Sequence, residues 1–151
     1  MIGRTDEEWL KTGIEVYVNR ILRYIPFQYT VVPDVKNGKS LPLQVLKEKE
    51  GEALLKLFSP GDMVVLLDEK GKHLASRELA TFMERQMLTG VKNLFFVIGG
   101  AYGFSDAVYQ RAGQKISLSR MTFSHQMVRL IFTEQLYRAM TIINNEPYHH
   151  D

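Results

Sequence analysis

Apolar residues recur every three or four positions in five segments of the chain. These segments are residues 6–25, 42–58, 76–88, 105–112 and 124–144. Such spacing is typical of amphipathic helices that bury one face. The last segment is the longest, and Ser124 at its start is predicted to cap the helix. The pattern therefore predicts a protein with at least five helices, each packed on a common core.

Short runs rich in apolar or β-branched residues alternate with these helices. They lie at residues 27–32, 62–68, 93–98 and 115–118. Continuous apolar runs of this length are typical of strands buried on both faces. Polar and glycine residues at 69–72 predict a turn after the second run. The alternation predicts an α/β fold with a largely parallel sheet flanked by helices.

The composition limits the class of protein. A chain of 151 residues, 45% apolar and 24% charged, can form one domain with a sizeable core, so we expect a single domain over residues 1–151. No apolar run reaches the roughly 18 residues that span a bilayer, and no secretory signal is recognisable, so we expect a cytoplasmic protein with no membrane partner. The lack of cysteine excludes disulfides and thiolate metal sites. A net charge of +2 does not by itself indicate a nucleic-acid binder.

Unusual residues follow three of the predicted strands. They are Leu67-Asp68, the pair Gly99-Gly100, and the segment SLSRMTF at 117–123. Because ligands in open α/β sheets bind beyond the carboxyl ends of the strands, these three ends predict one pocket. The glycines match neither GxGxxG nor GxxxxGK[ST], which disfavours a Rossmann dinucleotide site and a P-loop. The residues alone leave two interpretations of 117–123 open: a well-packed loop, or a loop around an apolar, hydrogen-bonding ligand such as adenine.

Several side chains near these segments are candidates for proton transfer or anion binding. Arg120 and Arg129 are either solvated cations or phosphate contacts. His125 lies at the start of a predicted helix, where the helix dipole disfavours its charged form. In the tail, Tyr148-His149 joins an aromatic ring to an imidazole, a pair able to stack on a base and to move a proton. No ligand spacing indicates a metal site, so we expect no metal.

Motifs spread over nearly the whole chain occur together in one known family. They are GIEVYVNRILRY, LKEKEGEALL, LLDEKG, VIGGAYG, LSRMTFSHQMVRLIFTEQLYRA and the final NEPYHH. In this combination the chain resembles the ribosomal RNA large subunit methyltransferase H family, which belongs to the SPOUT class of knotted methyltransferases. One difference concerns the start: family members usually begin with an apolar strand, whereas here Ile2-Gly3-Arg4-Thr5 resembles the end of the segment that follows it. This leaves the N-terminal edge of the sheet in question.

The resemblance implies a fold, a methyl donor and a reaction. The fold would be a SPOUT-type, largely parallel sheet with a C-terminal deep trefoil knot, and the knot loops would bind S-adenosylmethionine. By position, the donor-binding residues would be Leu67, Gly99, Gly100, Leu118, Ser119, Arg120, Met121, Thr122 and Phe123. The reaction would methylate N3 of a pseudouridine in 23S ribosomal RNA, catalysed by a homodimer on the assembled ribosome.

The same resemblance makes His149 and Tyr148 the candidates for handling the N3 proton, with Arg129 and His125 as supporting groups. Three alternatives remain open at the level of sequence. One is a SPOUT-class methyltransferase that acts on transfer RNA. The others are a non-catalytic ribosome-binding module and a small α/β nucleotide-binding protein.

Overall fold

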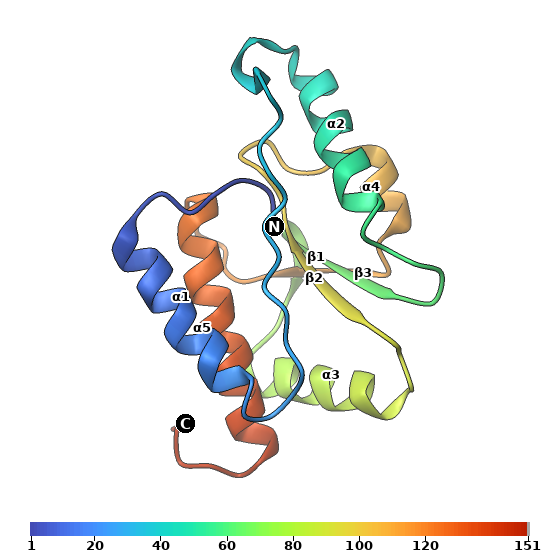
Figure 1. The fold of residues 1–151 in the computed structure, drawn as a ribbon. Coiled ribbons are helices and arrows are strands. Elements are labelled where there is room, and N and C mark those ends of the chain that lie inside the picture. The colour runs from blue at the N-terminus through green and yellow to red at the C-terminus, as the bar shows by residue number, and fades with distance from the viewer. Residues whose placement is uncertain (151) are drawn as a thin grey trace.

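A small parallel sheet lies at the centre of the fold (Figure 1). The computed structural model describes residues 1–150. The strands are β1 (Met63–His73), β2 (Leu94–Ile98) and β3 (Gln114–Ser117), in the order β2-β1-β3 and all parallel. The helices are α1 (Glu8–Ile21), α2 (Leu43–Leu55), α3 (Ser76–Leu88), α4 (Asp106–Arg111) and α5 (His125–Ile143), with a 3₁₀ turn at Gly38–Ser40. The predicted α/β class, with a parallel sheet flanked by helices, is confirmed.

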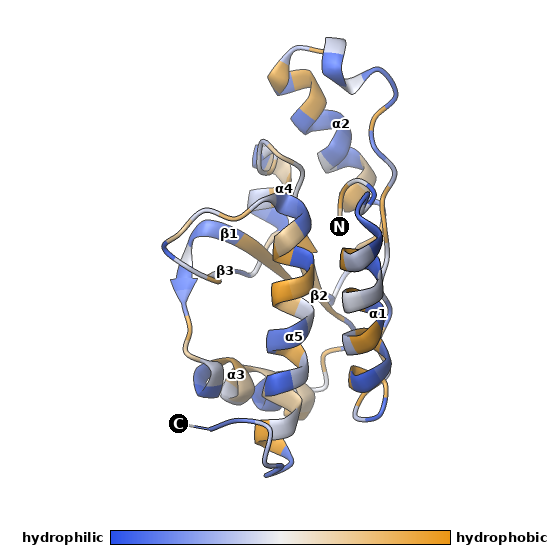
Figure 2. Ribbon diagram, turned by 90° about the vertical axis from the view of Figure 1, so that its left-hand side faces the viewer, coloured by the Kyte–Doolittle hydropathy of each residue, from blue (hydrophilic) through white to orange (hydrophobic). Residues whose placement is uncertain are grey.

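Helices cover both faces of the sheet. α1, α3 and α5 pack on one face and α2 and α4 on the other, so the core has two parts (Figure 1). Because side chains alternate along a strand, Leu66 of β1 joins the core under α2 and α4, whereas Leu67 contacts the core under α5. Figure 2 shows hydrophobic and hydrophilic bands alternating along α5, as expected for a helix with one buried face.

The central strand β1 is longer than the sequence predicts. The predicted turn at 69–72 is wrong, because β1 continues through these residues. Ile116 of β3 lies opposite both Leu67 and Lys72, so the pairing shifts register between them. A Cβ atom at Gly71 would lie only 2.5 Å from the carbonyl carbon of Ile116. Glycine is therefore required here because the two backbones pass too closely for a side chain.

The predicted strand at 27–32 is wrong. The segment runs past the sheet in light blue in Figure 1, but it forms only one isolated parallel bridge, between Ile2 and Val32. Ile2 also donates its N–H to the carbonyl of Ile98 at the end of β2, at 3.1 Å. The β-branched and aromatic residues favour extended backbone, but a strand also needs a ladder of partners. Within residues 1–150, main-chain partners for this segment come only from residues 1–3, which lie beside β2 through the hydrogen bond from Ile2 to Ile98.

Arg129 of α5 fixes this N-terminal segment to the rest of the fold. Its side chain is fully buried, at 0% exposed. The guanidinium donates to the carbonyl of Ile2 at 2.7 Å and to the hydroxyl of Thr5 at 2.8 Å. Burial lowers the pKa of Arg129. These two hydrogen bonds compensate part of the cost of taking the charge out of water.

Replacing Arg129 with methionine tests this role. Arg129→Met keeps much of the side-chain volume but leaves the Ile2 carbonyl and the Thr5 hydroxyl without their donor. We expect the free energy of unfolding, measured by urea titration, to fall by about 2–4 kcal/mol. Arg23→Met is the matched control: Arg23 is exposed after the end of α1, and its loss should change the free energy by less than about 0.5 kcal/mol. Equal stability of the two variants would contradict the role given to Arg129.

Candidate functional site

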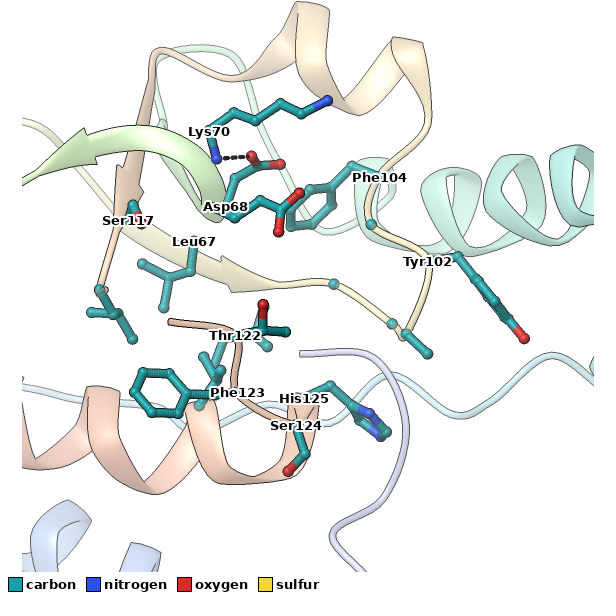
Figure 3. A pocket seen from close by; sticks show the side chains of 18 of the residues that line it. Leu67, Asp68, Lys70, Tyr102, Phe104, Ser117, Thr122, Phe123, Ser124 and His125 are labelled. Atoms are coloured by element: carbon teal, nitrogen blue, oxygen red, sulfur yellow. Dashed lines mark hydrogen bonds between the residues drawn. The ribbon is translucent and has the colours of Figure 1, made fainter. Parts of the chain in front are cut away.

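A pocket of about 660 Å³ opens beside the middle of β1 and beyond the carboxyl ends of β2 and β3. Its walls are residues 67–70 of β1, the segment 98–104 after β2, and the segment 117–125 that leads from β3 into α5. Figure 3 shows Leu67 and Asp68 on one side of the pocket and Thr122, Phe123 and His125 on the other. The three segments that the sequence marks therefore do meet at one pocket, but Leu67-Asp68 is not a strand end, because β1 continues to His73.

The pocket collects most of the residues that the sequence marks as donor-binding. Those that line it are Leu67, Gly99, Gly100, Leu118, Ser119, Met121, Thr122 and Phe123. Arg120 belongs to the same loop and is exposed, but it is not part of the lining. His125, a predicted supporting group, does line the pocket. The structure thus brings together residues from three segments, and their contact with a ligand stays a prediction.

Glycines form the wall that follows β2. A Cβ atom at Gly99 would lie 3.1 Å from the ring of Phe104, which is buried. A Cβ atom at Gly100 would lie 2.8 Å from a carboxylate oxygen of Glu50 on α2. Gly103 has a φ of +78°, a conformation that favours glycine. The backbone of this segment therefore forms the pocket wall directly, with packed side chains close behind it.

Hydroxyl groups hold the loop at 117–123 in shape. Ser117 donates to the carbonyl of Ser119 at 2.9 Å, and the Ser119 hydroxyl accepts the N–H of Met121 at 2.9 Å. Ser124 caps α5 by accepting the N–H of Met127 at 3.2 Å, as predicted. The polar residues that raised the possibility of ligand contact thus also fold the loop itself. The interpretation as a well-packed loop is therefore confirmed. The loop also lines the pocket, and its contact with a ligand stays a prediction.

Asp68, at the end of the buried part of β1, is tied to α4. One carboxylate oxygen accepts the hydroxyl of Tyr109 at 2.5 Å, and the other accepts the main-chain N–H of Lys70 at 2.8 Å. Burial, followed by the hydrogen bond that Tyr109 donates to Asp68, raises the pKa of Tyr109 to about 12, so the phenol remains a neutral donor. The Tyr109 ring packs edge-on against the ring of Phe104, with 5.8 Å between the two ring centroids. The sequence marks Asp68 only as a strand end, and no local pattern connects it with Tyr109.

The predicted catalytic residues of the tail lie away from this pocket. Tyr148 and His149 follow the C-terminal end of α5, whereas His125 begins the helix. α5 has 19 residues, which at 1.5 Å per residue corresponds to a length of about 28 Å. Arg129 is also outside the lining, buried against the N-terminal segment. Within one chain, His125 is therefore the only one of the four predicted catalytic residues in the pocket, among the residues described.

A network of charged and aromatic groups positions the tail. The Tyr148 hydroxyl donates to Glu134 at 3.2 Å and lies 3.5 Å from the hydroxyl of Tyr17. Arg138 donates to the same Glu134 oxygen at 2.5 Å. Its guanidinium carbon lies 4.8 Å from the centroid of the Tyr148 ring, and one of its nitrogens lies 3.5 Å from Nδ1 of His149. Burial, followed by the contacts with Tyr17 and Glu134, raises the pKa of Tyr148. The tail thus presents a neutral phenol beside an imidazole.

Two further properties of the described residues bear on function. No group of three or more His, Asp or Glu side chains within residues 1–150 is arranged to hold a metal ion. Over the same range, no helix combines the length and the apolar character needed to cross a membrane. The expectation of a metal-free protein stays a prediction.

Comparison with known proteins identifies the family. A family model described as "Predicted SPOUT methyltransferase" matches residues 1–149. A protein of Parabacteroides distasonis named "Ribosomal RNA large subunit methyltransferase H" is 58% identical over 151 residues, covering 100% of this chain and 96% of that protein. Proteins of the same name from Bacteroides thetaiotaomicron (57%, 100% of this chain and 96% of that protein) and Christiangramia forsetii (54%, 99% and 95%) are similar along their length. The chain therefore belongs to the SPOUT methyltransferase family, and within it to the ribosomal RNA large subunit methyltransferase H proteins.

Proposed function

We propose that this protein transfers a methyl group from S-adenosylmethionine to N3 of a pseudouridine in 23S ribosomal RNA, on the assembled ribosome in the cytoplasm. The observation that carries the proposal is the pocket, which brings together Leu67, Gly99 and Leu118 in a chain that the SPOUT family model matches over residues 1–149. The name of these relatives, ribosomal RNA large subunit methyltransferase H, supports ribosomal RNA as the substrate. The target nucleotide and the requirement for assembled ribosomes go beyond that name and rest on the resemblance.

The pocket suits the proposed donor. Its volume of about 660 Å³ lies within the range of small-molecule sites. Apolar side chains of Leu118, Phe123 and Val128 line the part next to α5, where an adenine ring would be shielded from water. The glycines after β2 let a ligand reach main-chain groups. The predicted trefoil knot is compatible with the close passage of β1 and β3 at Gly71, and remains part of the proposal.

Methyl transfer from a sulfonium is an in-line displacement, so the protein mainly aligns the two reactants and excludes water. The acceptor N3 must lose a proton. Tyr148, whose pKa is raised, is a poor base and suits donation of a hydrogen bond to a base carbonyl. His149 is then the group proposed to accept the proton, with Arg138 beside it. His125 is proposed to contact the acceptor nucleotide from the pocket side.

The separation of tail and pocket leads to the proposed homodimer. One chain holds its tail at the opposite end of α5 from its own pocket. We propose that the tail of a second copy completes each pocket. Symmetric dimers are the commonest oligomers, and a two-fold axis would form two equivalent sites at once.

The main test is incubation of the protein with purified ribosomes and S-adenosylmethionine, followed by mass spectrometry of the ribosomal RNA. We expect one added methyl group on N3 of a pseudouridine in the 23S RNA. Naked 23S RNA should be a much weaker substrate, because a chain with a net charge of +2 has little general affinity for RNA. Methylation of transfer RNA instead would favour the first alternative, and ribosome binding without methylation would favour the non-catalytic module.

A substitution after β2 tests the donor pocket. In Gly99→Ala the new methyl group must displace the packed ring of Phe104, whereas in Gly100→Ala it meets only the flexible end of Glu50. We expect Gly99→Ala to raise the Kd for S-adenosylhomocysteine about tenfold and Gly100→Ala about two- to threefold, by isothermal titration. Thermal unfolding of both variants provides the control for folding. Unchanged affinity in a folded Gly99→Ala protein would argue against this wall as donor site.

Mixing two inactive variants tests the composite site. Gly99→Val should block the pocket while leaving the tail intact, and His149→Ala should disable the tail while leaving the pocket intact. Each protein alone is expected to be inactive on ribosomes. After unfolding and refolding together, half of the dimers would be mixed and each would hold one intact site, so about a quarter of wild-type methylation should return. If the mixture stays inactive although mixed dimers are detected by native mass spectrometry, pocket and tail of the same chain act together.

A further inference from the structure

The pocket has two chemically different ends. Among the residues described, the end next to α5 carries no acidic or lysine side chain and presents the apolar Leu118, Phe123 and Val128 together with Thr122, Ser124 and His125. The opposite end, next to α2 and α4, is lined by charged side chains from two elements, namely Lys47 of α2 with Asp68, Glu69 and Lys70 of β1. A ligand that fills the whole pocket therefore needs an apolar aromatic part at one end and a charged part at the other.

Asp68 is the best-positioned of these charged groups. The Tyr109 hydroxyl and the Lys70 main-chain N–H each occupy one acceptor position on its carboxylate. An ionised carboxylate offers about four such positions, so about two remain for a ligand. The two contacts also fix the rotation of the side chain, and a charged acceptor held in place loses little entropy when it binds. Glu69, by contrast, is exposed and has no comparable anchor in the described part of the chain.

Lys47 provides the opposite charge. It lies on the face of α2 that borders the pocket and is half-buried. Within residues 1–150 it takes part in no ion pair, so its ammonium group is available to a ligand anion. A fixed carboxylate and an available ammonium group at one end of a pocket are complementary to a zwitterion, which carries one charge of each sign.

We propose that Asp68 binds the α-ammonium group and Lys47 the α-carboxylate of the donor's amino-acid part, with Tyr109 as the positioning residue for Asp68. This assignment rests on the proposed function, because it takes an adenosyl amino acid as the ligand. It orients the donor along the pocket: the adenine lies toward α5 and the amino acid toward α2 and α4. The sulfur then lies between these two ends of the pocket.

The first experiment varies the ligand and leaves the protein unchanged. Isothermal titration compares S-adenosylhomocysteine, its analogue without the α-amino group, and 5′-methylthioadenosine, which lacks the whole amino-acid part. We expect loss of the α-amino group to raise the Kd at least about tenfold, as expected for a hydrogen bond to a charged group. Equal affinity for S-adenosylhomocysteine and the deaminated analogue overturns the proposal. Failure of the protein to bind any of the three ligands overturns the proposed function instead.

The second experiment asks which carboxylate is responsible. Asp68→Asn keeps the shape of the side chain and an acceptor for Tyr109. It should raise the Kd for S-adenosylhomocysteine about tenfold and leave the Kd for the deaminated analogue and for 5′-methylthioadenosine within twofold. Tyr109→Phe should show the same selectivity with a smaller change. Lys47→Gln should raise the Kd for S-adenosylhomocysteine about threefold and leave the Kd for 5′-methylthioadenosine unchanged.

Glu69→Gln is the matched control, since it removes a carboxylate from the same end of the pocket without touching an anchored group. It should leave all three affinities within twofold. A selective loss in Glu69→Gln and none in Asp68→Asn overturns the assignment to Asp68. An equal loss for all three ligands in Asp68→Asn, with retained binding in Lys47→Gln, also overturns it, because Asp68 would then act on the adenosine part or on the fold.

Discussion

The parallel pairing of β1 with strands on both sides is the constraint on which the rest of the structure depends. It aligns the three strands so that Leu67 lies beside Ile98 on one side and Ile116 on the other. The residues that follow all emerge at one edge of the sheet, which is where the pocket forms. Parallel pairing also requires crossover connections, and these place α3 on one face and α4 on the other. The same hydrogen bonds therefore determine both the layers and the position of the site.

The parts of the fold that follow from local periodicity could be predicted from the sequence. α3, α5 and β2 lie within one residue of the predicted bounds, because their apolar patterns, and for α5 also its cap Ser124, are contained in the segments themselves. The segment 27–32 has the composition of a strand but forms only an isolated bridge in the described part of the chain, because a strand depends on neighbours that no local pattern reveals. Residues 69–72 have turn composition, yet they form strand because Gly71 permits a close passage beside β3.

The candidate site likewise has features that could be predicted from the sequence and features that depend on distant residues. The pocket wall could be predicted because residues that follow neighbouring parallel strands lie at one edge of the sheet, whereas the contact between Asp68 and Tyr109 joins residues 41 positions apart. For Arg129, the helical spacing of its neighbours indicates burial. It shares one helical face with Phe132, Thr133 and Leu136, all of them buried. The spacing of three, four and seven residues already places the guanidinium in the core, and its charge alone made it a candidate for ligand contact.

The length of α5 connects the donor pocket with the proposed dimer. The helix separates two chemically distinct centres, the pocket beside its first residue and the phenol and imidazole beyond its last. A rigid helix of about 28 Å cannot bring its own two ends together. A two-fold axis perpendicular to α5 sets two such helices antiparallel, so that each pocket faces the other chain's tail. In that arrangement the donor-binding half of the site forms when one chain folds, and the proton-handling half joins it only on association. Donor binding and catalysis are then separable properties of the same fold.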